Sequence, residues 1–585
     1  MTEQNTVTRY PARRWLLMGL FALGMGALLW RAADLQLMRN VFLQDHGDAR
    51  SLRVVEIPAH RGMVTDRYGE PLAVSTPVHA VWATPRQLLA GEGRLPELAK
   101  LLNMDVRELK TLLEDRVGRE FVYLRRHLDP GLAQRVAALG LPGVSLGREY
   151  RRYYPASEVT AHILGFTNVD DIGQEGIELA FDKWLRGTPG AKRVLKDRLG
   201  RIVENVESIR PSSPGQDLVL SIDRRVQYLA YRELKAAVQR NAARGGSIVM
   251  LDAKSGEVLA MVSQPSYNPN NRGGLKRDYF RNRAVTDVFE PGSAIKPFTI
   301  ASAIETGKYT PATVVDTRPG YISVGGHTIR DLQNYGVIDV ATVIKKSSNV
   351  GASKIALSLD PKGLWAMLTN VGFGQITDSG FPGEASGHLD DYRSWPEVEH
   401  ATLAFGYGLS VTALQLAQAY TVLAADGLLY AVTLQKLQDK PQGQRVMKES
   451  TAAAVRSMLE AVVHEGGTGQ LAQITGYRVA GKTGTVHKST AGGYAEDRYV
   501  SVFAGMAPAT RPRLVMVVVI DEPRGHQHFG GQVAAPVFSK VMGGAMRLMN
   551  IAPDDTTGLK RQRLAYVNEV SDGGAGGGPV WSSPP

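Results

Sequence analysis

A serine and a lysine three residues apart are the first residues of this chain whose types could do chemistry together. Ser293 and Lys296 follow the Pro291-Gly292 turn, which can begin a helix. If a helix starts at Ser293, the two side chains lie on one face, with the hydroxyl near the positive end of the helix dipole. A serine hydroxyl becomes a strong nucleophile when a base takes its proton, and a lysine can do so where burial or a second cation lowers its pKa. The spacing predicts a nucleophile and its base.

Two polar motifs further along the chain could complete such a site. Ser347-Ser348-Asn349 follows a helical pattern and could offer a hydroxyl and an amide. Lys482-Thr483-Gly484-Thr485 is flanked by strand-like residues, so the glycine would let a substrate backbone approach while the lysine and threonine side chains hold a carboxylate. Similar triplets at residues 254–256 and 266–268 both precede Ser293. Only one set therefore stands in the order serine-lysine, serine-asparagine, lysine-threonine-glycine.

The composition excludes several other chemistries. The 585 residues include no cysteine, which removes disulfides, thiolate catalysis, zinc-cysteine sites and iron-sulfur clusters, and suits an oxidising compartment. With 43% hydrophobic and 21% charged residues, most of the chain can bury a core. The net charge of +11 is spread along the sequence without basic runs or RNA-binding motifs, so we expect no nucleic-acid partner.

The elements that must position the motifs begin with an apolar N-terminal segment. Arginines precede an apolar run from Trp15 to Trp30. The run predicts a transmembrane anchor over residues 15–38, with residues 1–14 in the cytoplasm and the rest of the chain outside. A cleaved signal peptide is the alternative, but no small-residue cleavage site follows cleanly, and the next residues continue a helical pattern.

The remaining chain divides at a proline- and glycine-containing linker, residues 211–215. Residues 39–215 mix short strand patterns with leucine-rich helical patterns and predict a non-catalytic pedestal domain. Residues 216–552 include a predicted β-hairpin at 246–261 and all three motifs, and predict the catalytic domain. The glycine-rich tail, residues 553–585, is predicted to be disordered.

The ordered set of three motifs resembles the signature of the penicillin-recognising serine enzymes. Arg61-Gly62 to Ala73 and Arg152-Tyr153-Tyr154-Pro155 are similar to the pedestal motifs of class B penicillin-binding proteins. Phe405 to Thr412 and Phe503 to Pro508 are similar to landmarks of their transpeptidase domain. The chain length and the residues around Ser293 are most similar to the division-type (septal) group of Gram-negative bacteria, penicillin-binding protein 3.

The resemblance implies an α/β (α+β) architecture, in which a transpeptidase domain with an antiparallel sheet flanked by helices follows an elongated pedestal and a single transmembrane helix. It implies a D,D-transpeptidase that cross-links peptidoglycan stem peptides at the septum through a serine acyl-enzyme and is inhibited by β-lactams. The catalytic residues that it implies are Ser293, Lys296, Ser347, Asn349 and Lys482. The substrate-binding residues that it implies are Thr483, Gly484, Thr485, His487, Tyr499 and Phe529. It implies no metal and no cofactor.

The implied partners are D-Ala-D-Ala stem peptides, β-lactam antibiotics, the inner membrane and division membrane proteins that include a glycan-polymerising partner. Catalysis would take place in the periplasm. Other functions stay open, because the same motifs serve β-lactam hydrolases and membrane-bound β-lactam sensors, and a silent division scaffold could keep the fold. The long pedestal argues against a soluble hydrolase, the short stretch before the anchor argues against a sensor, and the intact motifs argue against a scaffold.

Two histidines depart from the family pattern. Alternation along the strand that carries Thr483 and Thr485 places His487 on their face, where division-type relatives commonly carry arginine. His528 precedes Phe529 at a position where relatives carry tyrosine. Histidine can gain charge in mildly acidic surroundings, so these positions predict either an acid-tuned member of the family or ordinary solvent-exposed histidines.

Overall fold

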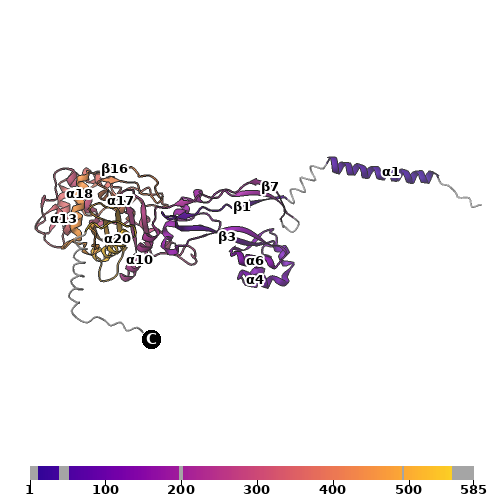
Figure 1. Ribbon diagram of the computed structural model, residues 1–585, viewed down its shortest axis with the longest axis horizontal. Helices are drawn as coiled ribbons and strands as arrows, with labels where there is room; N and C mark the ends of the chain where they lie inside the picture. The colour runs from indigo at the N-terminus through magenta and orange to yellow at the C-terminus, as the bar shows by residue number, and fades with distance from the viewer. Residues whose placement is uncertain (1–10, 39–51, 197–201, 491–492, 556–585) are drawn as a thin grey trace, which may run out of the picture. The chain divides into compact units, whose positions relative to one another are not determined.

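The computed structural model describes residues 11–38, 52–196, 202–490 and 493–555 (Figure 1). They belong to two compact units. The first unit consists of the chain up to residue 60 and of residues 77–151 and 187–215. The second consists of residues 61–76, residues 152–186 and the chain from residue 216 onward. Apart from residues 553–555, the predicted disordered tail lies outside the described residues.

Helix α1 (Pro11–Ala33) is the apolar N-terminal segment (Figure 1). None of its residues is buried, and Trp15 and Trp30 are 70% and 69% exposed. The helical stretch over Pro11–Gln36 is long and apolar enough to cross a membrane. The segment predicted as an anchor thus has the length that an anchor requires, and a short π-helical turn, η1 (Asp34–Met38), follows it.

The first unit contains sheets and a layer of short helices. Strands β1 (Leu52–Ile57), β6 (Gly190–Lys196) and β7 (Ile202–Arg210) form an antiparallel sheet. Strand β3 (Pro71–Ala83), which enters this unit at residue 77, pairs with β4 (Val122–Leu128) and with β5 (Val144–Tyr153), which leaves it after residue 151. The helices are α3 (Pro85–Leu89), α4 (Leu95–Leu102), α5 (Val106–Glu114) and α6 (Pro130–Ala138).

A leucine-rich core explains these helices. Leu98, Leu102 and Leu109 are buried together on the faces that the helical periodicity predicts. The leucine-rich pattern over residues 95–113 forms two helices, because Asn103 adopts a left-handed backbone at φ +51° and Asp105 caps the second helix.

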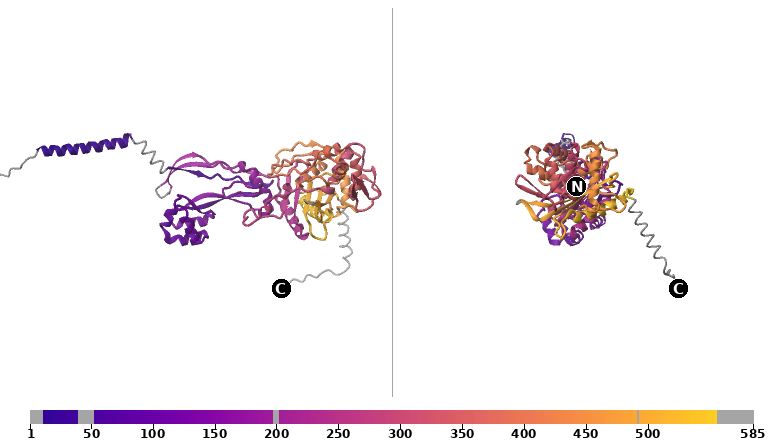
Figure 2. Two further views of the ribbon diagram at one scale, coloured as in Figure 1. Left: turned by 180° about the vertical axis from the view of Figure 1, so that it is seen from behind. Right: turned by 90° about the vertical axis from the view of Figure 1, so that its left-hand side faces the viewer.

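A five-stranded antiparallel sheet organises the second unit. Its strand order is β10 (Val258–Gln264), β9 (Gly245–Asp252), β19 (Leu514–Asp521), β18 (Gly493–Ala507) and β17 (Ala480–Thr490). The predicted hairpin at 246–261 is the β9–β10 pair. Strand β19, from near the C-terminus, therefore lies between β9 and β18 in one sheet, and the yellow C-terminal elements lie within this unit (Figure 2). Strand β17 is an edge strand, so one side of its backbone has no strand partner among the described residues.

Helices cover both faces of this sheet. Val249, Val517 and neighbouring odd-numbered residues pack toward α17 (Ala413–Ala424), which is buried along its whole length. Ile248, Val518 and neighbouring even-numbered residues pack toward α10 (Arg224–Arg240) and α20 (Ala535–Leu548), which contact each other (Figure 1). The alternation of β-strand side chains produces these two cores. The predicted antiparallel sheet flanked by helices is confirmed.

Shorter elements complete the second unit. The helices are α7 (Ala161–Leu164), α8 (Gly176–Ala180), α9 (Asp182–Leu185), α11 (Arg283–Thr286), α12 (Lys296–Glu305), α13 (Val340–Lys346), α14 (Asn349–Leu357), α15 (Pro361–Asn370), α16 (Glu397–Leu403), α18 (Glu449–Val463) and α19 (Gly530–Val533). The paired short strands are β2 (Val64–Thr65) with β8 (Leu218–Val219), β11 (Val314–Asp316) with β14 (Val337–Asp339), β12 (Tyr321–Val324) with β13 (His327–Arg330), and β15 (Leu428–Leu429) with β16 (Gln444–Arg445).

A buried ion cluster links two early segments of the second unit. Glu178 accepts hydrogen bonds from Arg61 at 2.8 Å and from Arg152 at 2.6 Å, and all three side chains are almost fully buried. Arg61 also donates to Asp182 at 2.8 Å. Residues 61–76 and 152–186 are thereby cross-linked inside one unit.

Candidate functional site

Ser293 and Lys296 form a contact pair. Ser293 lies in a 3₁₀ turn, η5 (Gly292–Ile295), and the chain becomes α-helical at Lys296, where α12 begins. The helix predicted to start at Ser293 thus begins as a 3₁₀ turn. The Nζ atom of Lys296 lies 2.9 Å from Oγ of Ser293. Gly292 has a left-handed backbone at φ +52°, which explains a glycine immediately before the serine.

Lys296 is fully buried among polar acceptors. Its Nζ donates to the Ser347 carbonyl oxygen at 2.6 Å and to Oδ1 of Asn349 at 2.8 Å. Burial holds the pKa of Lys296 well below its usual value, the nearby Lys482 lowers this pKa further, and Asp331 opposes both effects. A lysine in these surroundings can be a neutral amine and accept the proton of Ser293.

The Ser347 hydroxyl lies between two lysines. Helix α13 ends at Ser347, whose left-handed backbone has φ +59°, and α14 begins two residues later. Oγ of Ser347 lies 3.2 Å from Nζ of Lys296 and 2.9 Å from Nζ of Lys482. Both lysines are fully buried, and burial lowers the pKa of Lys482 to about 7. A proton can pass along this row of three groups.

Asp331 holds the serine-asparagine segment in place. Its carboxylate accepts hydrogen bonds from Oγ of Ser348 at 2.6 Å and from the backbone N–H groups of Asn349 and Val350 at 2.5 and 3.1 Å. It thereby caps α14. Reasoning from the sequence missed this residue, because it follows β13 and no fixed spacing connects it with Ser347.

The lysine-threonine-glycine motif lies on the edge strand β17. Oγ1 of Thr485 accepts a hydrogen bond from the Gly530 N–H at 2.9 Å, and the Thr483 hydroxyl contacts that of Thr468 at 2.8 Å. A Cβ atom at Gly484 would lie 2.7 Å from the Pro291 carbonyl oxygen. This glycine lets the segment before Ser293 approach the strand, a reason that the sequence analysis did not foresee. Its predicted role toward substrate stays a prediction.

Four rings form a continuous row beside this strand. His487 lies 4.6 Å from Tyr499 between ring centroids, Tyr499 stacks on His528 at 4.0 Å, and His528 lies 4.5 Å from Phe529. Nδ1 of His487 lies 2.9 Å from the Ala495 carbonyl oxygen. The structure thus brings His487, Tyr499 and Phe529 together.

Two further contacts hold the nucleophile segment, and the sequence analysis missed both. Oε1 of Glu290 accepts from the Gly408 N–H and from the Tyr494 hydroxyl, each at 2.9 Å. The buried Tyr420 hydroxyl donates to the Ala294 carbonyl oxygen at 2.8 Å. Only the tertiary fold brings these segments together, so no local sequence pattern predicts these contacts.

The site as a whole combines an activated hydroxyl, two buried amines and an open strand edge. Such a set can form and resolve an acyl-enzyme while the strand and its lysine hold a carboxylate-bearing peptide. Among the residues that the structure describes, no group of three or more acidic or histidine side chains could hold a metal ion.

Comparisons with known proteins point in one direction. A sequence profile described as penicillin binding protein transpeptidase domain matches residues 246–543, and one described as penicillin-binding protein dimerisation domain matches residues 56–220. The chain is 44% identical over 564 residues to peptidoglycan D,D-transpeptidase FtsI of Escherichia coli K12, with 95% of each chain covered. It is 43% identical over 542 residues to probable peptidoglycan D,D-transpeptidase PbpC of Pseudomonas aeruginosa, with 92% of this chain and 96% of the relative covered.

Solved structures give the same relationship. The transpeptidase domain of penicillin-binding protein 3 from Burkholderia pseudomallei is 45% identical, with a TM-score of 0.54, and the match covers 57% of this chain and 98% of that one. Penicillin-binding protein 3 from Mycobacterium tuberculosis, complexed with aztreonam, is 28% identical with a TM-score of 0.67, covering 86% of this chain and 98% of that one.

Proposed function

The chain belongs to the penicillin-binding proteins, as a division-type peptidoglycan D,D-transpeptidase, and we propose that Ser293 is the nucleophile of its acyl transfer. The observation that carries this assignment is the 2.9 Å contact between Ser293 Oγ and a fully buried Lys296. A hydroxyl beside a neutral amine is activated for attack.

The reaction proceeds in two acyl transfers. Oγ of Ser293 attacks the penultimate D-Ala carbonyl of a stem peptide and gives its proton to Lys296. The peptide bond breaks, the terminal D-Ala leaves with that proton on its amine, and a serine ester remains. The amine of a second stem peptide then attacks the ester, loses a proton to the same base, and restores Ser293.

The neighbouring side chains have distinct roles in this proposal. Ser347 relays protons between the two lysines, since its hydroxyl is within hydrogen-bond distance of both. Asn349 orients the peptide, and Lys482 with Thr483 and Thr485 holds the substrate carboxylate. Gly484, His487, Tyr499 and Phe529 form the substrate-binding wall. The backbone N–H groups of Ser293 and Thr485 stabilise the oxyanion.

The location and partners follow from the same proposal. Helix α1 anchors the protein once in the inner membrane, and the catalytic domain works in the periplasm. Substrates are D-Ala-D-Ala stem peptides, β-lactams are inhibitors, and division membrane proteins, including a glycan-polymerising partner, supply the new strands. No metal or cofactor takes part in the steps above.

Labelling with a fluorescent penicillin tests the nucleophile. We expect Ser293→Ala to abolish labelling while thermal unfolding stays unchanged, because the exchange removes one oxygen atom. Ser457→Ala, at an exposed serine of α18, is the matched control and should label normally. A labelled Ser293→Ala protein would refute the assignment.

The lifetime of the adduct separates a transferase from a hydrolase. A hydrolase needs a base that activates water against the ester, whereas Asp331, the carboxylate that raises the pKa of Lys296, is already bound by three donors. We therefore expect the penicilloyl adduct to last for many minutes, as intact-mass spectrometry would show. Rapid release of hydrolysed penicillin would instead favour a β-lactamase.

A further inference from the structure

A cavity of about 690 Å³ lies in the second unit beside the segment that precedes Ser293. Its floor is the sheet face formed by Val486, Val500 and Val519, and Phe289 and Leu409 also line it. Small-molecule sites commonly have volumes of about 300–1,000 Å³ and mostly apolar walls. The cavity can therefore hold the apolar body of a small ligand.

The cavity adjoins the proposed acylation site, since His487 of the substrate-binding wall also lines it, and the two share two chain segments. None of the motif side chains from Ser293 to Thr485 lines it. Phe289 and Glu290 lie just before Ser293 in sequence, and Val486 to Ser489 directly follow Thr485 on β17. A molecule in the cavity would therefore press on the segments that position both the nucleophile and the substrate-binding strand.

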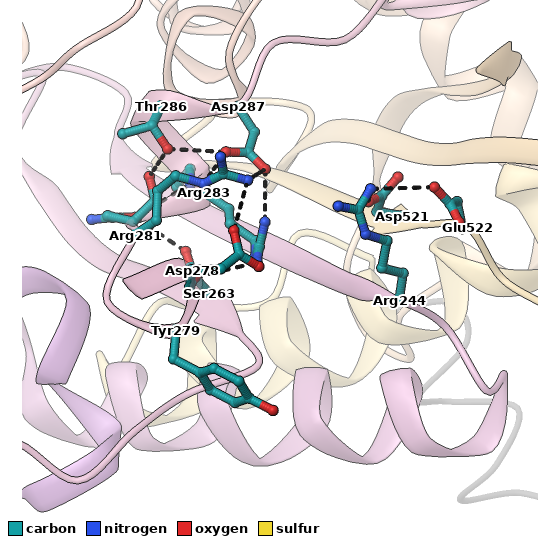
Figure 3. Close-up of polar contacts among 12 residues, drawn as sticks. Arg244, Ser263, Asp278, Tyr279, Arg281, Arg283, Thr286, Asp287, Asp521 and Glu522 are labelled. Carbon is teal, nitrogen blue, oxygen red and sulfur yellow. Dashed lines mark hydrogen bonds and ion pairs between the residues drawn. The ribbon is translucent and has the colours of Figure 1, made fainter. Parts of the chain in front are cut away.

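Residues that line the cavity take part in two groups of ion pairs (Figure 3). Arg281 and Arg283 pair with Asp278 and Asp287 at 2.6–3.4 Å. Arg244 pairs with Asp521 at 3.8 Å and with Glu522 at 3.3 Å.

In the second group of ion pairs, Arg244 is only weakly paired. Lys488 binds Asp521 and Glu522 more closely than Arg244 does, at 2.6 and 2.8 Å. Arg244 uses only Nη1 in these pairs, and its Nε and Nη2 atoms make no hydrogen bond to the residues that the structure describes. Its side chain is 49% exposed, compared with 22% for Asp521. The open Nε/Nη2 edge has the two parallel donors that a carboxylate accepts.

We propose that this cavity is a second ligand site, which takes a small carboxylate with an apolar body and changes the rate of acylation at Ser293. The carboxylate binds the Nε/Nη2 edge of Arg244, and the apolar body lies on Val486, Val500 and Val519. The binding step stands independently of the proposed nucleophile, whereas the effect on acylation rests on it.

The absence of cysteine from the sequence provides a clean test of binding. Ser247 lines the cavity floor, so Ser247→Cys in the full chain places a single thiol there. The measurement is the rate at which methyl methanethiosulfonate modifies this thiol. Ser457→Cys on α18 is the control outside the cavity, and Ser410→Cys is a second cavity reporter if the first variant does not fold.

Two probes with the same apolar body and head groups of opposite charge show which charge the cavity prefers. We expect 4-phenylbutyrate to protect the Ser247→Cys thiol at concentrations about tenfold lower than 4-phenylbutylamine, because a paired carboxylate gains a charge-assisted bidentate contact. Arg244→Gln should remove this difference, while Lys488 still holds Asp521 and Glu522. The Ser457→Cys thiol should react equally with and without either probe.

Different outcomes test the binding site, its effect on acylation and the proposed nucleophile. An unreactive cavity thiol, equal protection by both probes, protection by neither, or a preference that survives Arg244→Gln would overturn the site. With phenylbutyrate bound, labelling by fluorescent penicillin should change severalfold in the wild-type chain and not in Arg244→Gln. An unchanged rate would overturn the regulatory part. Penicillin labelling at a serine other than Ser293 would refute the proposed nucleophile without affecting thiol protection.

Discussion

The two buried lysines give the site a chemistry that depends on their protonation states. Lys296 must be neutral to accept a proton, and burial favours that state. Lys482 binds a carboxylate best as a cation, but burial lowers its pKa to about 7. Burial therefore favours the neutral form of Lys296, which the base needs. It also reduces the fraction of Lys482 that is cationic near neutral pH, and so weakens carboxylate binding.

Acylation should accelerate as the pH falls through 7. For a group with a pKa of about 7, the protonated fraction rises from about a tenth at pH 8 to about nine tenths at pH 6. We expect the second-order rate of acylation by a carboxylate-bearing penicillin to rise severalfold over this range. Protonation of Lys296 acts in the opposite direction, because a cationic Lys296 cannot accept the proton of Ser293. A stopped-flow pH profile that rises toward pH 8 would contradict this expectation.

His487→Arg tests whether the histidine causes acid tuning. The His487 ring contacts Tyr499, which stacks on His528, while Lys482 lies five residues earlier on β17. If Lys482 sets the profile, the variant should keep the rise between pH 8 and pH 6. If His487 sets it, as an acid-tuned member of the family would require, a permanent cation should flatten the rise. The measured profile therefore decides between the two groups.

At the scale of elements, the loop after β13 controls the geometry of the serine-asparagine segment. Asp331→Asn removes a carboxylate that accepts three hydrogen bonds at the start of α14. We expect acylation to slow by about tenfold or more, since Ser348 and Asn349 lose their support. The pH below which protonation of Lys296 slows acylation should also become lower, because the Asp331 charge raises the pKa of Lys296.

A second helix cap provides the control for Asp331. Asp360 caps α15 by accepting from the Lys362 N–H, so Asp360→Ala loses a capping contact of about 1 kcal/mol. It should lower the thermal midpoint without moving the acylation profile. If both variants changed the thermal midpoint and the acylation profile equally, Asp331 would act only as a helix cap.

Elements with a strong local pattern were predictable from the sequence, whereas supporting contacts were not. The β9–β10 hairpin and the face shared by Thr485 and His487 follow from alternation, which is a property of the strand itself. Asp331, Glu290 and Tyr420 reach the site from sequence-distant segments, so only the fold reveals them. The close approach of Gly484 to the Pro291 carbonyl oxygen likewise becomes visible only in the fold.

At the scale of the whole molecule, the second unit is built from three separate stretches of chain. Residues 61–76 and 152–186 join the chain from 216 onward, although residues of the first unit lie between them in sequence. The cluster of Arg61, Arg152 and Glu178 joins the two early stretches at the positions of the family's pedestal motifs. These motifs therefore contribute to the stability of the unit that contains the site.

Glu178→Gln should destabilise this unit without altering its chemistry. The exchange keeps the side-chain shape but leaves Arg61 and Arg152 buried without their shared counter-charge, at a cost of about 3 kcal/mol or more. Glu207→Gln, which breaks the exposed pair with Arg193, is the matched control and should cost less than about 1 kcal/mol. Thermal and urea unfolding measure the difference, while penicillin labelling well below the midpoint should proceed at the wild-type rate. Equal midpoints for the two variants would mean that the buried cluster contributes no net stability, and slow labelling of folded Glu178→Gln would mean that the cluster also affects the active site.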